Sequence, residues 1–330
     1  MVIGTQTQRR RLGENAWLRR AGQTEFYPHL GLWLALFGLF SLNMAWVFID
    51  PRLSLSPRTL AKLAVVFFGT ALAQAYRQWR DVKRDRHLDA LFRMLMLALF
   101  AGFLTQQVNL FSHLAMTLGR PLADSSLAAW DSAIGFDWND YARVVASQRW
   151  SRAVLFIAYS LLIGPALGII LGVAVWRGRH DRVDELAFLA LASGFICVAI
   201  AGLLPAISAW NSIATPGVRA LVGPQPQAWL AQVMALRGSN PVSLDFGTME
   251  GIATFPSFHT CLALIILWCS RGSWVGFLPG CGVGLAILAA TPVYGGHYGV
   301  DVMGGAAVMA GLILLWRRIA PGPPPGQARP

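Results

Sequence analysis

Two histidines and one aspartate lie beside apolar segments in the last quarter of the chain. His297 and Asp301, in the stretch TPVYGGHYGVDV, are four residues apart, so on a helix their side chains would share one face. A carboxylate next to an imidazole fixes the tautomer of the ring and stabilises its cation. His297 could therefore act as a nucleophile that Asp301 orients, with His259 as a general acid.

The segment around His259 offers a place for an anion. In GIATFPSFHTCLALIILW, Pro256 stands where a first helical turn would begin, a position that suits proline because its missing N–H costs nothing there. Ser257 and His259 are then expected in the first turn, where free amides and the positive end of the helix dipole attract anions. Because Ser257 adds a hydroxyl donor, the sequence predicts a phosphate site here.

The order of these motifs carries more information than either motif alone. A histidine at a helix end is usually structural, and P-S-x-H is a short pattern. P-S-x-H, one apolar hairpin and then G-H-x-x-x-D, each at the same end of a membrane span, form a more specific combination. Gly295, Gly296 and Gly299 leave room for a substrate or backbone to approach His297.

The composition is that of a membrane protein. Of 330 residues, 55% are hydrophobic and 13% are charged, with a mean hydropathy of +0.51, whereas soluble domains carry about 25% charged residues. The thirteen tryptophans suit anchors at two membrane interfaces. The net charge is +11, but most basic residues lie in short loops between apolar runs, so we interpret them as topology signals and expect no nucleic-acid partner.

The four cysteines lie within or beside apolar stretches and are expected to be core residues. They form no CxxC pair, which argues against a zinc site or a disulfide framework. They are Cys197, Cys261, Cys269 and Cys281.

Eight segments are apolar enough to be membrane spans, each of which needs about 20 mainly apolar residues. The sequence therefore predicts an all-α integral membrane protein with about eight transmembrane helices. The segments lie near 29–49, 59–76, 92–117, 153–176, 185–207, 257–269, 274–292 and 299–316.

The distribution of basic residues predicts the orientation of these spans. One set of loops, together with both termini, holds 18 of the 27 Lys and Arg residues, so this side is expected to be cytoplasmic. His297 and Ser257 then face outward, and the composition suits a bacterial inner membrane. The external loops are predicted near 50–58, 118–152, 208–256 and 293–298.

One external loop mixes aromatic and acidic residues at loosely helical spacing. The stretch LAAWDSAIGFDWNDYARVV is compatible with an amphipathic helix at the membrane interface and equally with a packed surface helix. At the other extreme, the proline-rich tail PGPPPGQARP is expected to be disordered.

With these motifs in place, the sequence resembles the phosphatidic acid phosphatase type 2 superfamily of membrane phosphatases and phosphotransferases. PSFH at 256–259 matches its second signature, and HYGVD at 297–301 matches the core of its third. FPSFH and GGHYGVDV, preceded by WDSAIGFDW, look closest to the aureobasidin-resistance, inositol phosphorylceramide synthase-like branch.

The resemblance covers about residues 90–318 and implies a division of the chain. A cytoplasmic N-terminal segment, 1–28, precedes two additional transmembrane helices and a basic cytoplasmic loop, 29–89. The six-helix phosphatase-type membrane domain would be 90–318, followed by the tail, 319–330.

The resemblance also implies a role for each motif residue. His297 would attack phosphorus and form a phosphohistidine, Asp301 would orient it, and Ser257 would bind phosphoryl oxygens. His259 would protonate the leaving oxygen and then activate the incoming water or alcohol. This chemistry needs no metal or other cofactor, and it implies a lipid phosphate or phospholipid substrate with inositol as a possible alcohol acceptor.

The family's phosphate-binding cations are depleted in this sequence. Ala290 and Thr291 stand where a Ser-Arg pair usually precedes the third-signature histidine. The first signature, K-x6-R-P, survives only as HLAMTLGRP, with His113 replacing lysine and Arg120 retained. The candidates for phosphate binding are Arg120 first, with His113, then Arg237 and Arg219, and more weakly Arg143.

Three functions remain open at this point. The leading one is a metal-independent lipid phosphatase or head-group phosphotransferase at the outer face, with an inositol phosphorylceramide synthase-like transferase as its more specific alternative. The motifs do not decide whether water or an alcohol accepts the phosphoryl group. A proton-coupled transporter that uses His297 and Asp301 as a relay is an alternative from another class, and a catalytically inactive scaffold is the third.

Overall fold

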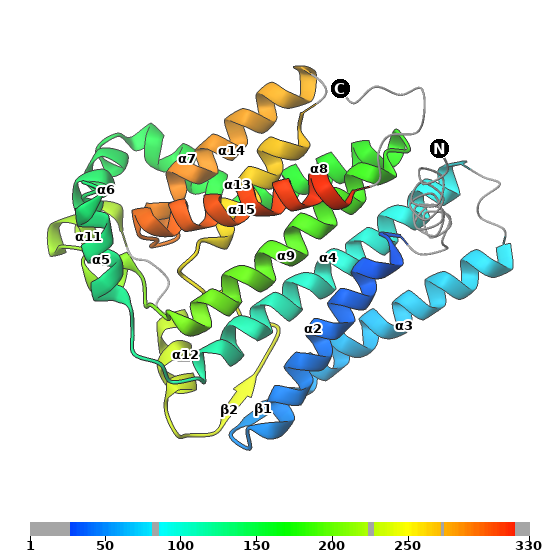
Figure 1. Ribbon diagram of the computed structural model, residues 1–330, viewed down its shortest axis with the longest axis horizontal. Helices are drawn as coiled ribbons and strands as arrows, with labels where there is room; N and C mark the ends of the chain where they lie inside the picture. Colours follow the sequence, from blue (N-terminus) through cyan, green and yellow to red (C-terminus); the bar gives the residue numbers. More distant parts are fainter. Residues whose placement is uncertain (1–26, 81–85, 224–227, 272–273, 321–330) are drawn as a thin grey trace, which may run out of the picture.

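The computed structural model describes residues 27–80, 86–223, 228–271 and 274–320 (Figure 1). The regular secondary structure of this part of the chain is helical apart from two three-residue strands, which confirms the predicted all-α membrane architecture. Of the N-terminal segment 1–28 and the tail 319–330, all but the innermost two residues lie outside the described residues.

The first three long helices form one side of the bundle. They are α2 (Leu30–Ile49), α3 (Pro57–Arg80) and α4 (Arg86–Met116), and they run side by side in Figure 1. Within this layer, Asn43 of α2 donates to the side chain and to the backbone carbonyl of Gln107 on α4, each over 3.0 Å. The pair gives the buried amide N–H₂ group of Asn43 its acceptors between the two helices, and a buried polar group without a partner is costly.

The central helix is α9 (His180–Leu203), which packs on α4, α13 and α15. It is the most buried of the long apolar helices: 61% of its apolar 18-residue segment is buried inside the protein. The hairpin of α13 (Phe258–Cys269) and α14 (Trp274–Tyr294) and the last helix, α15 (Gly299–Ile319), complete the membrane region.

The predicted span at 153–176 is bent. It consists of α7 (Arg149–Leu161) and α8 (Ile163–Trp176), whose axes differ by 56°. Gly164 and Pro165 directly follow the break, and a proline inside a helix removes one backbone hydrogen bond. The bend therefore has a local cause in the sequence, although the prediction gave this segment only as one span, without a bend.

All eight predicted spans fall on helices of the described residues. Six of these helices are individually long and apolar enough to cross a membrane, the bent pair could form a seventh span, and α13 is shorter, with twelve residues.

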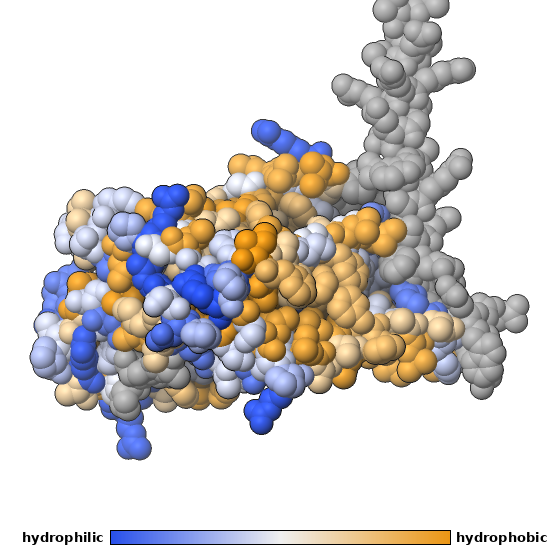
Figure 2. Space-filling view, turned by 90° about the horizontal axis from the view of Figure 1, so that it is seen from below, coloured by the Kyte–Doolittle hydropathy of each residue, from blue (hydrophilic) through white to orange (hydrophobic). Residues whose placement is uncertain are grey.

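The remaining short elements gather at one end of the bundle (Figure 1). They are α5 (Asp124–Ala133), α6 (Trp138–Ser147), α10 (Ala209–Ser212), α11 (Pro216–Val222), α12 (Ala228–Arg237), β1 (Leu53–Leu55) and β2 (Val242–Leu244). The two strands pair in parallel and join the loop after α2 to the loop before α13. Figure 2 shows hydrophobic side chains spread over the middle of the molecule, with hydrophilic ones more frequent toward the end that carries the short helices.

Candidate active site

The start of α13 presents Ser257 as the helix N-cap. Its hydroxyl accepts a hydrogen bond from the amide of Thr260 over 3.2 Å. The helix begins at Phe258, so Pro256 lies before the cap and not at the first helical position as predicted. Among the described residues, the amides of Phe258 and His259 have no hydrogen-bond acceptor, as expected for the first turn of a helix.

His297 and Asp301 form the predicted pair. The ring Nδ1 lies 3.0 Å from the carboxylate Oδ2, and both side chains are buried. His297 precedes the helix, because α15 begins at Gly299 with Tyr298 as its N-cap. Asp301 is the third residue of the helix, and its Oδ2 also accepts the amide of Tyr298 over 3.0 Å. The pair thus meets through a helix cap and not along a helix face.

Two contacts join this pair to the start of α13. The Ser257 hydroxyl lies 3.3 Å from His297 Nε2, and the Ser257 amide donates to the carbonyl of Asp301 over 3.0 Å. Ser257 therefore faces the ring nitrogen that Asp301 leaves free. A phosphoryl group attacked by that nitrogen would be within reach of the Ser257 hydroxyl and of the free α13 amides.

Tyr159 of α7 is a partner that the sequence did not reveal. Its hydroxyl lies 3.1 Å from His259 Nδ1, and its ring stacks on the imidazole with centroids 4.5 Å apart. The rings of His259 and His297 are 6.0 Å apart. Since a tyrosine hydroxyl can donate or accept, it can serve His259 in both protonation states and leaves Nε2 for a substrate.

Gly295 brings Tyr159 and His297 together. A Cβ atom at this position would lie 2.6 Å from the Tyr159 hydroxyl and 2.6 Å from His297 Cδ2. Both groups therefore occupy the space that any larger residue would fill, so at Gly295 the room is taken by side chains of the site.

The aromatic and acidic stretch at 127–145 supports the third motif from behind. Asp131 of α5 accepts the amides of Gly299 and Val300 over 2.9 and 2.8 Å, so it caps the start of α15. The indole N–H of Trp138 on α6 lies 3.1 Å from the carbonyl of His297 and 3.0 Å from that of Pro292. Of the two predicted alternatives, the structure favours a packed segment, made of two helices.

A second acid, Asp124, is buried beneath Tyr298. The Tyr298 hydroxyl and the Ser212 hydroxyl each donate to it over 2.9 Å, and the amide of Ile207 donates to both oxygens. Burial raises the pKa of Tyr298 well above its ordinary value, so this phenol stays a hydrogen-bond donor at neutral pH. The N-cap of α15 is thereby fixed from two sides.

Burial likewise raises the pKa of Asp131, against the two amide hydrogen bonds that lower it. Burial thus disfavours the charged form of Asp131 more than the hydrogen bonds from the α15 amides favour it.

The predicted phosphate-binding residues His113, Arg120 and Arg237 form a group apart from His259 and His297. His113 is buried at the end of α4, with Nδ1 2.9 Å from the carbonyl of Asn109 and Nε2 3.1 Å from Gln232 Oε1. Arg237 donates to the carbonyl of Arg120 over 2.7 Å. No hydrogen bond or ion pair between described residues joins His113, Arg120 or Arg237 to His259 or His297.

The weaker candidates have protein partners of their own. Arg219 donates to the carbonyls of Trp210 and Asn211, and Arg143 pairs with Asp140 on the surface. Thr291, in the place of the missing arginine, is buried and donates to the carbonyl of Ile287 over 2.7 Å.

No described group of three or more His, Cys, Asp or Glu side chains could hold a metal ion. The four cysteines are free thiols, and Cys197 lies 3.7 Å from Cys261 in the core.

The supporting residues Asp131, Trp138, Tyr159 and Asp124 were not predicted, and they differ in how strongly the sequence signals them. Asp131 and Trp138 belong to WDSAIGFDW, whose mixture of aromatic and acidic residues marks the stretch in the sequence without indicating which groups these side chains would contact. Tyr159 and Asp124 carry no comparable signal, because each meets its partner only through contacts that are more than 80 residues apart in the sequence.

Comparison with known proteins identifies one matching family. The family model of the PAP2 superfamily matches residues 125–315, more than half of the chain and the whole of the site from Asp131 to Asp301. No curated protein and no solved structure is significantly similar to the chain. On the match to the family model, the chain belongs to the PAP2 superfamily.

Proposed function

We propose that this protein is a membrane enzyme that takes a phosphoryl-containing group from a lipid and passes it through a covalent intermediate on His297. Membership of the PAP2 superfamily supports a phosphatase-type function on lipids. The observation that carries the mechanism is the position of His297 Nε2, 3.3 Å from Ser257 at the open start of α13, while Nδ1 is held by Asp301.

In the first step, His297 Nε2 attacks phosphorus and forms a P–N bond as the P–O bond to the leaving group breaks. The proton on Nδ1 stays in the hydrogen bond to Asp301, which stabilises the positive charge that develops on the ring. His259 Nε2 gives a proton to the leaving oxygen, with Tyr159 holding the opposite side of that ring.

The equatorial oxygens gain negative character as the phosphoryl group transfers, so they need donors or cations. Ser257 and the two free amides of α13 supply donors at the positive end of a helix dipole. Arg120, His113 and Arg237 remain predicted contributors, although no hydrogen bond or ion pair between described residues joins them to His259 or His297.

In the second step, His259 takes a proton from the acceptor, whose oxygen attacks phosphorus and releases His297. With water the protein is a lipid phosphatase, and with an alcohol it is a head-group transferase. The inositol phosphorylceramide synthase-like motifs make inositol the first alcohol to test. From the arginine-rich opposite end of the bundle, we place this site at the outer face of the membrane.

The test is to incubate the purified protein with a panel of lipid phosphates, with and without inositol, and to analyse the lipids by mass spectrometry. We expect release or exchange of a head group that persists in a chelator, is inhibited by vanadate and is lost in His297→Ala. His180→Ala, at the other end of the molecule, serves as the matched control and should retain activity.

Full activity of His297→Ala would refute the phosphohistidine. Absence of turnover with every lipid of the panel, despite a folded protein, would favour a transporter or an inactive scaffold over an enzyme. A proton flux in proteoliposomes that depends on His297 would then identify the transporter.

A further inference from the structure

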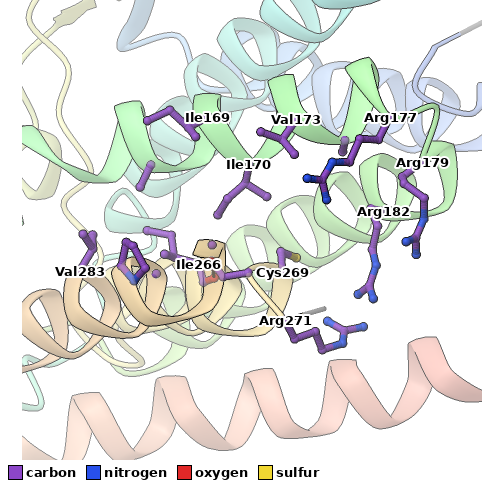
Figure 3. A pocket seen from close by; sticks show the side chains of 16 residues that line it. Ile169, Ile170, Val173, Arg177, Arg179, Arg182, Ile266, Cys269, Arg271 and Val283 are labelled. Carbon is purple, nitrogen blue, oxygen red and sulfur yellow. Dashed lines mark hydrogen bonds between the residues drawn. The ribbon is translucent and has the colours of Figure 1, made fainter. Parts of the chain in front are cut away.

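A cavity of about 480 Å³ lies at the end of the bundle opposite the two histidines (Figure 3). It is lined by residues of α8, α9, the end of α13 and the start of α14, and it is open on one side. Ile266, the first residue of α13 that lines the cavity, follows Ser257 by nine residues, or about 13 Å along the helix axis. The cavity is therefore separate from the proposed active site.

The lining divides the cavity into two parts. Figure 3 shows aliphatic side chains gathered at one end and arginine side chains at the other. The aliphatic part includes Ile169, Ile170, Val173, Ile266, Pro279 and Val283, and the basic part consists of Arg177, Arg179, Arg182 and Arg271.

The basic part carries more positive charge than its acidic partners neutralise. Glu185 is shared, since Arg271 donates to both of its oxygens at 2.8 and 3.1 Å and Arg182 donates to one at 3.1 Å. Arg179 pairs with Asp181. Four arginines thus face two carboxylates, which leaves two positive charges at the mouth of the cavity.

Arg177 is the arginine that can meet a ligand with least competition. Its side chain is exposed and has no hydrogen-bond or ion-pair partner among the described residues. It also borders a smaller neighbouring cavity lined by Asp89, Arg93 and His180.

The rest of the basic part is held in place. Arg271 lies over the ring of Trp268 at 3.7 Å from its centroid, and the Trp268 indole donates to Glu185 over 2.8 Å. A binding group that is fixed before the ligand arrives loses less conformational entropy on binding. This arrangement is therefore suited to recognition and not only to setting topology.

We propose that this cavity binds an anionic phospholipid of the surrounding leaflet, with its phosphate at the arginines and an acyl chain along the aliphatic part. A small soluble anion would leave the aliphatic part unfilled, and a zwitterionic lipid would leave the excess positive charge uncompensated. Basic pockets between transmembrane helices are known to take anionic lipid head groups. The proposal stands whether or not the protein turns over a lipid phosphate.

The test uses the full-length protein, purified in detergent and freed of co-purifying lipid. Dioleoyl phosphatidylglycerol and dioleoyl phosphatidylcholine, which share the same acyl chains, are titrated separately and bound lipid is measured by native mass spectrometry. We expect tighter binding of phosphatidylglycerol, weakened about fivefold by Arg177→Gln. Arg318 is an exposed arginine in the last turn of α15 and does not line the cavity. Arg318→Gln should therefore leave the affinity unchanged.

The aliphatic part is tested by Val173→Trp, which adds bulk without changing charge and should weaken binding about tenfold. Ile169→Trp replaces it if that variant does not fold, as judged by its melting temperature without added lipid. Equal affinity for the two lipids would overturn the proposal. Weakening by Arg177→Gln alone would also overturn it, because the lipid would then lie outside this cavity. An affinity that neither substitution changes would overturn it as well, because the lipid would then occupy the distant active site.

Discussion

Two helices begin at the candidate active site, and their first turns are capped in opposite ways. The first turn of α13 is capped by the Ser257 hydroxyl, which uses one amide and leaves those of Phe258 and His259 free. The first turn of α15 is capped by the Asp131 carboxylate, which takes both available amides. The two turns are in direct contact through the hydrogen bond from the Ser257 amide to the Asp301 carbonyl.

The difference assigns a separate task to each turn. A carboxylate at the start of α15 satisfies the amides and the positive dipole end there, so no charge remains to attract a ligand. No acidic residue lies in the first turn of α13, so its dipole and amides are available to a phosphate. The first turn of α13 is therefore an open turn, available for binding, and the first turn of α15 is a closed turn, a fixed support for His297 and Asp301.

The largest effect is expected from separating the two turns. Gly305 of α15 is so close to α13 that a Cβ atom would collide with the carbonyl oxygen of Ser257 and lie 2.9 Å from Thr260. Gly305→Ala should therefore reduce turnover about 10³-fold by displacing donors from the phosphate, and destabilise the protein by about 1–3 kcal/mol.

Turnover with a lipid phosphate and the melting temperature of the detergent-solubilised protein measure these two effects. Gly311→Ala is the matched control, because it lies on the same helix with nothing within 4 Å of the new methyl group. Normal turnover in Gly305→Ala would show that the contact between the two turns is not needed for the reaction.

The open turn is tested by Ser257→Ala. On the proposed role of Ser257 as a phosphoryl ligand, loss of its hydroxyl should lower turnover about 10²-fold, while loss of the N-cap costs about 1 kcal/mol of stability. Ser270→Ala, at the other end of α13, removes a hydroxyl bonded to the Ile266 carbonyl and should leave turnover unchanged. A stability loss without a loss of turnover would mean that Ser257 is only a helix cap.

The partner of His259 beside the open turn is tested by Tyr159→Phe. The ring and its stacking remain, but the hydrogen bond to Nδ1 is lost, so kcat should fall about tenfold with little change in KM. Tyr141→Phe removes a comparable hydrogen bond, to the carbonyl of Ala289, and is expected to preserve kcat. Equal kcat values in the two variants would exclude Tyr159 as a positioning residue.

The open turn could be predicted from the sequence, whereas most of the support could not. Ser257, His259, His297 and Asp301 lie in two short motifs, and a motif is local by definition. Tyr159 reaches His259 across 100 residues, a relation that neither periodicity nor composition records.

The same distinction applies to the fold. Span positions followed from hydropathy alone, because a membrane requires long apolar helices. The bend between α7 and α8 had a local signal in Gly164 and Pro165, but its angle depends on the packing of both halves against α14, α9 and α13. The strands β1 and β2 were missed because each has three residues and pairs with a segment almost 190 residues away.

The closed turn is tested by Asp131→Asn, with the smallest expected effect on turnover. An amide side chain keeps one acceptor but points an N–H₂ group at the other α15 amide, so stability should fall by about 1–2 kcal/mol while turnover falls only severalfold. Asp137→Asn is the matched control, since Asp137 caps α6 through a single hydrogen bond to Asp140 and asparagine is an equally good N-cap.

The pH dependence of stability tests whether burial or the α15 amides dominate the pKa of Asp131. Because the pKa of Asp131 in the folded protein is raised above its ordinary value of 3.8, the folded chain binds this proton more tightly than the unfolded chain. Between 3.8 and the raised pKa, the free energy of unfolding should therefore decrease as pH rises, and Asp131→Asn should lack this contribution. Melting temperatures of the two proteins across this window should thus converge as pH increases. Curves that diverge instead would mean that the α15 amides stabilise the carboxylate more than burial opposes it, and the closed turn would then be an anion site already occupied by its own side chain.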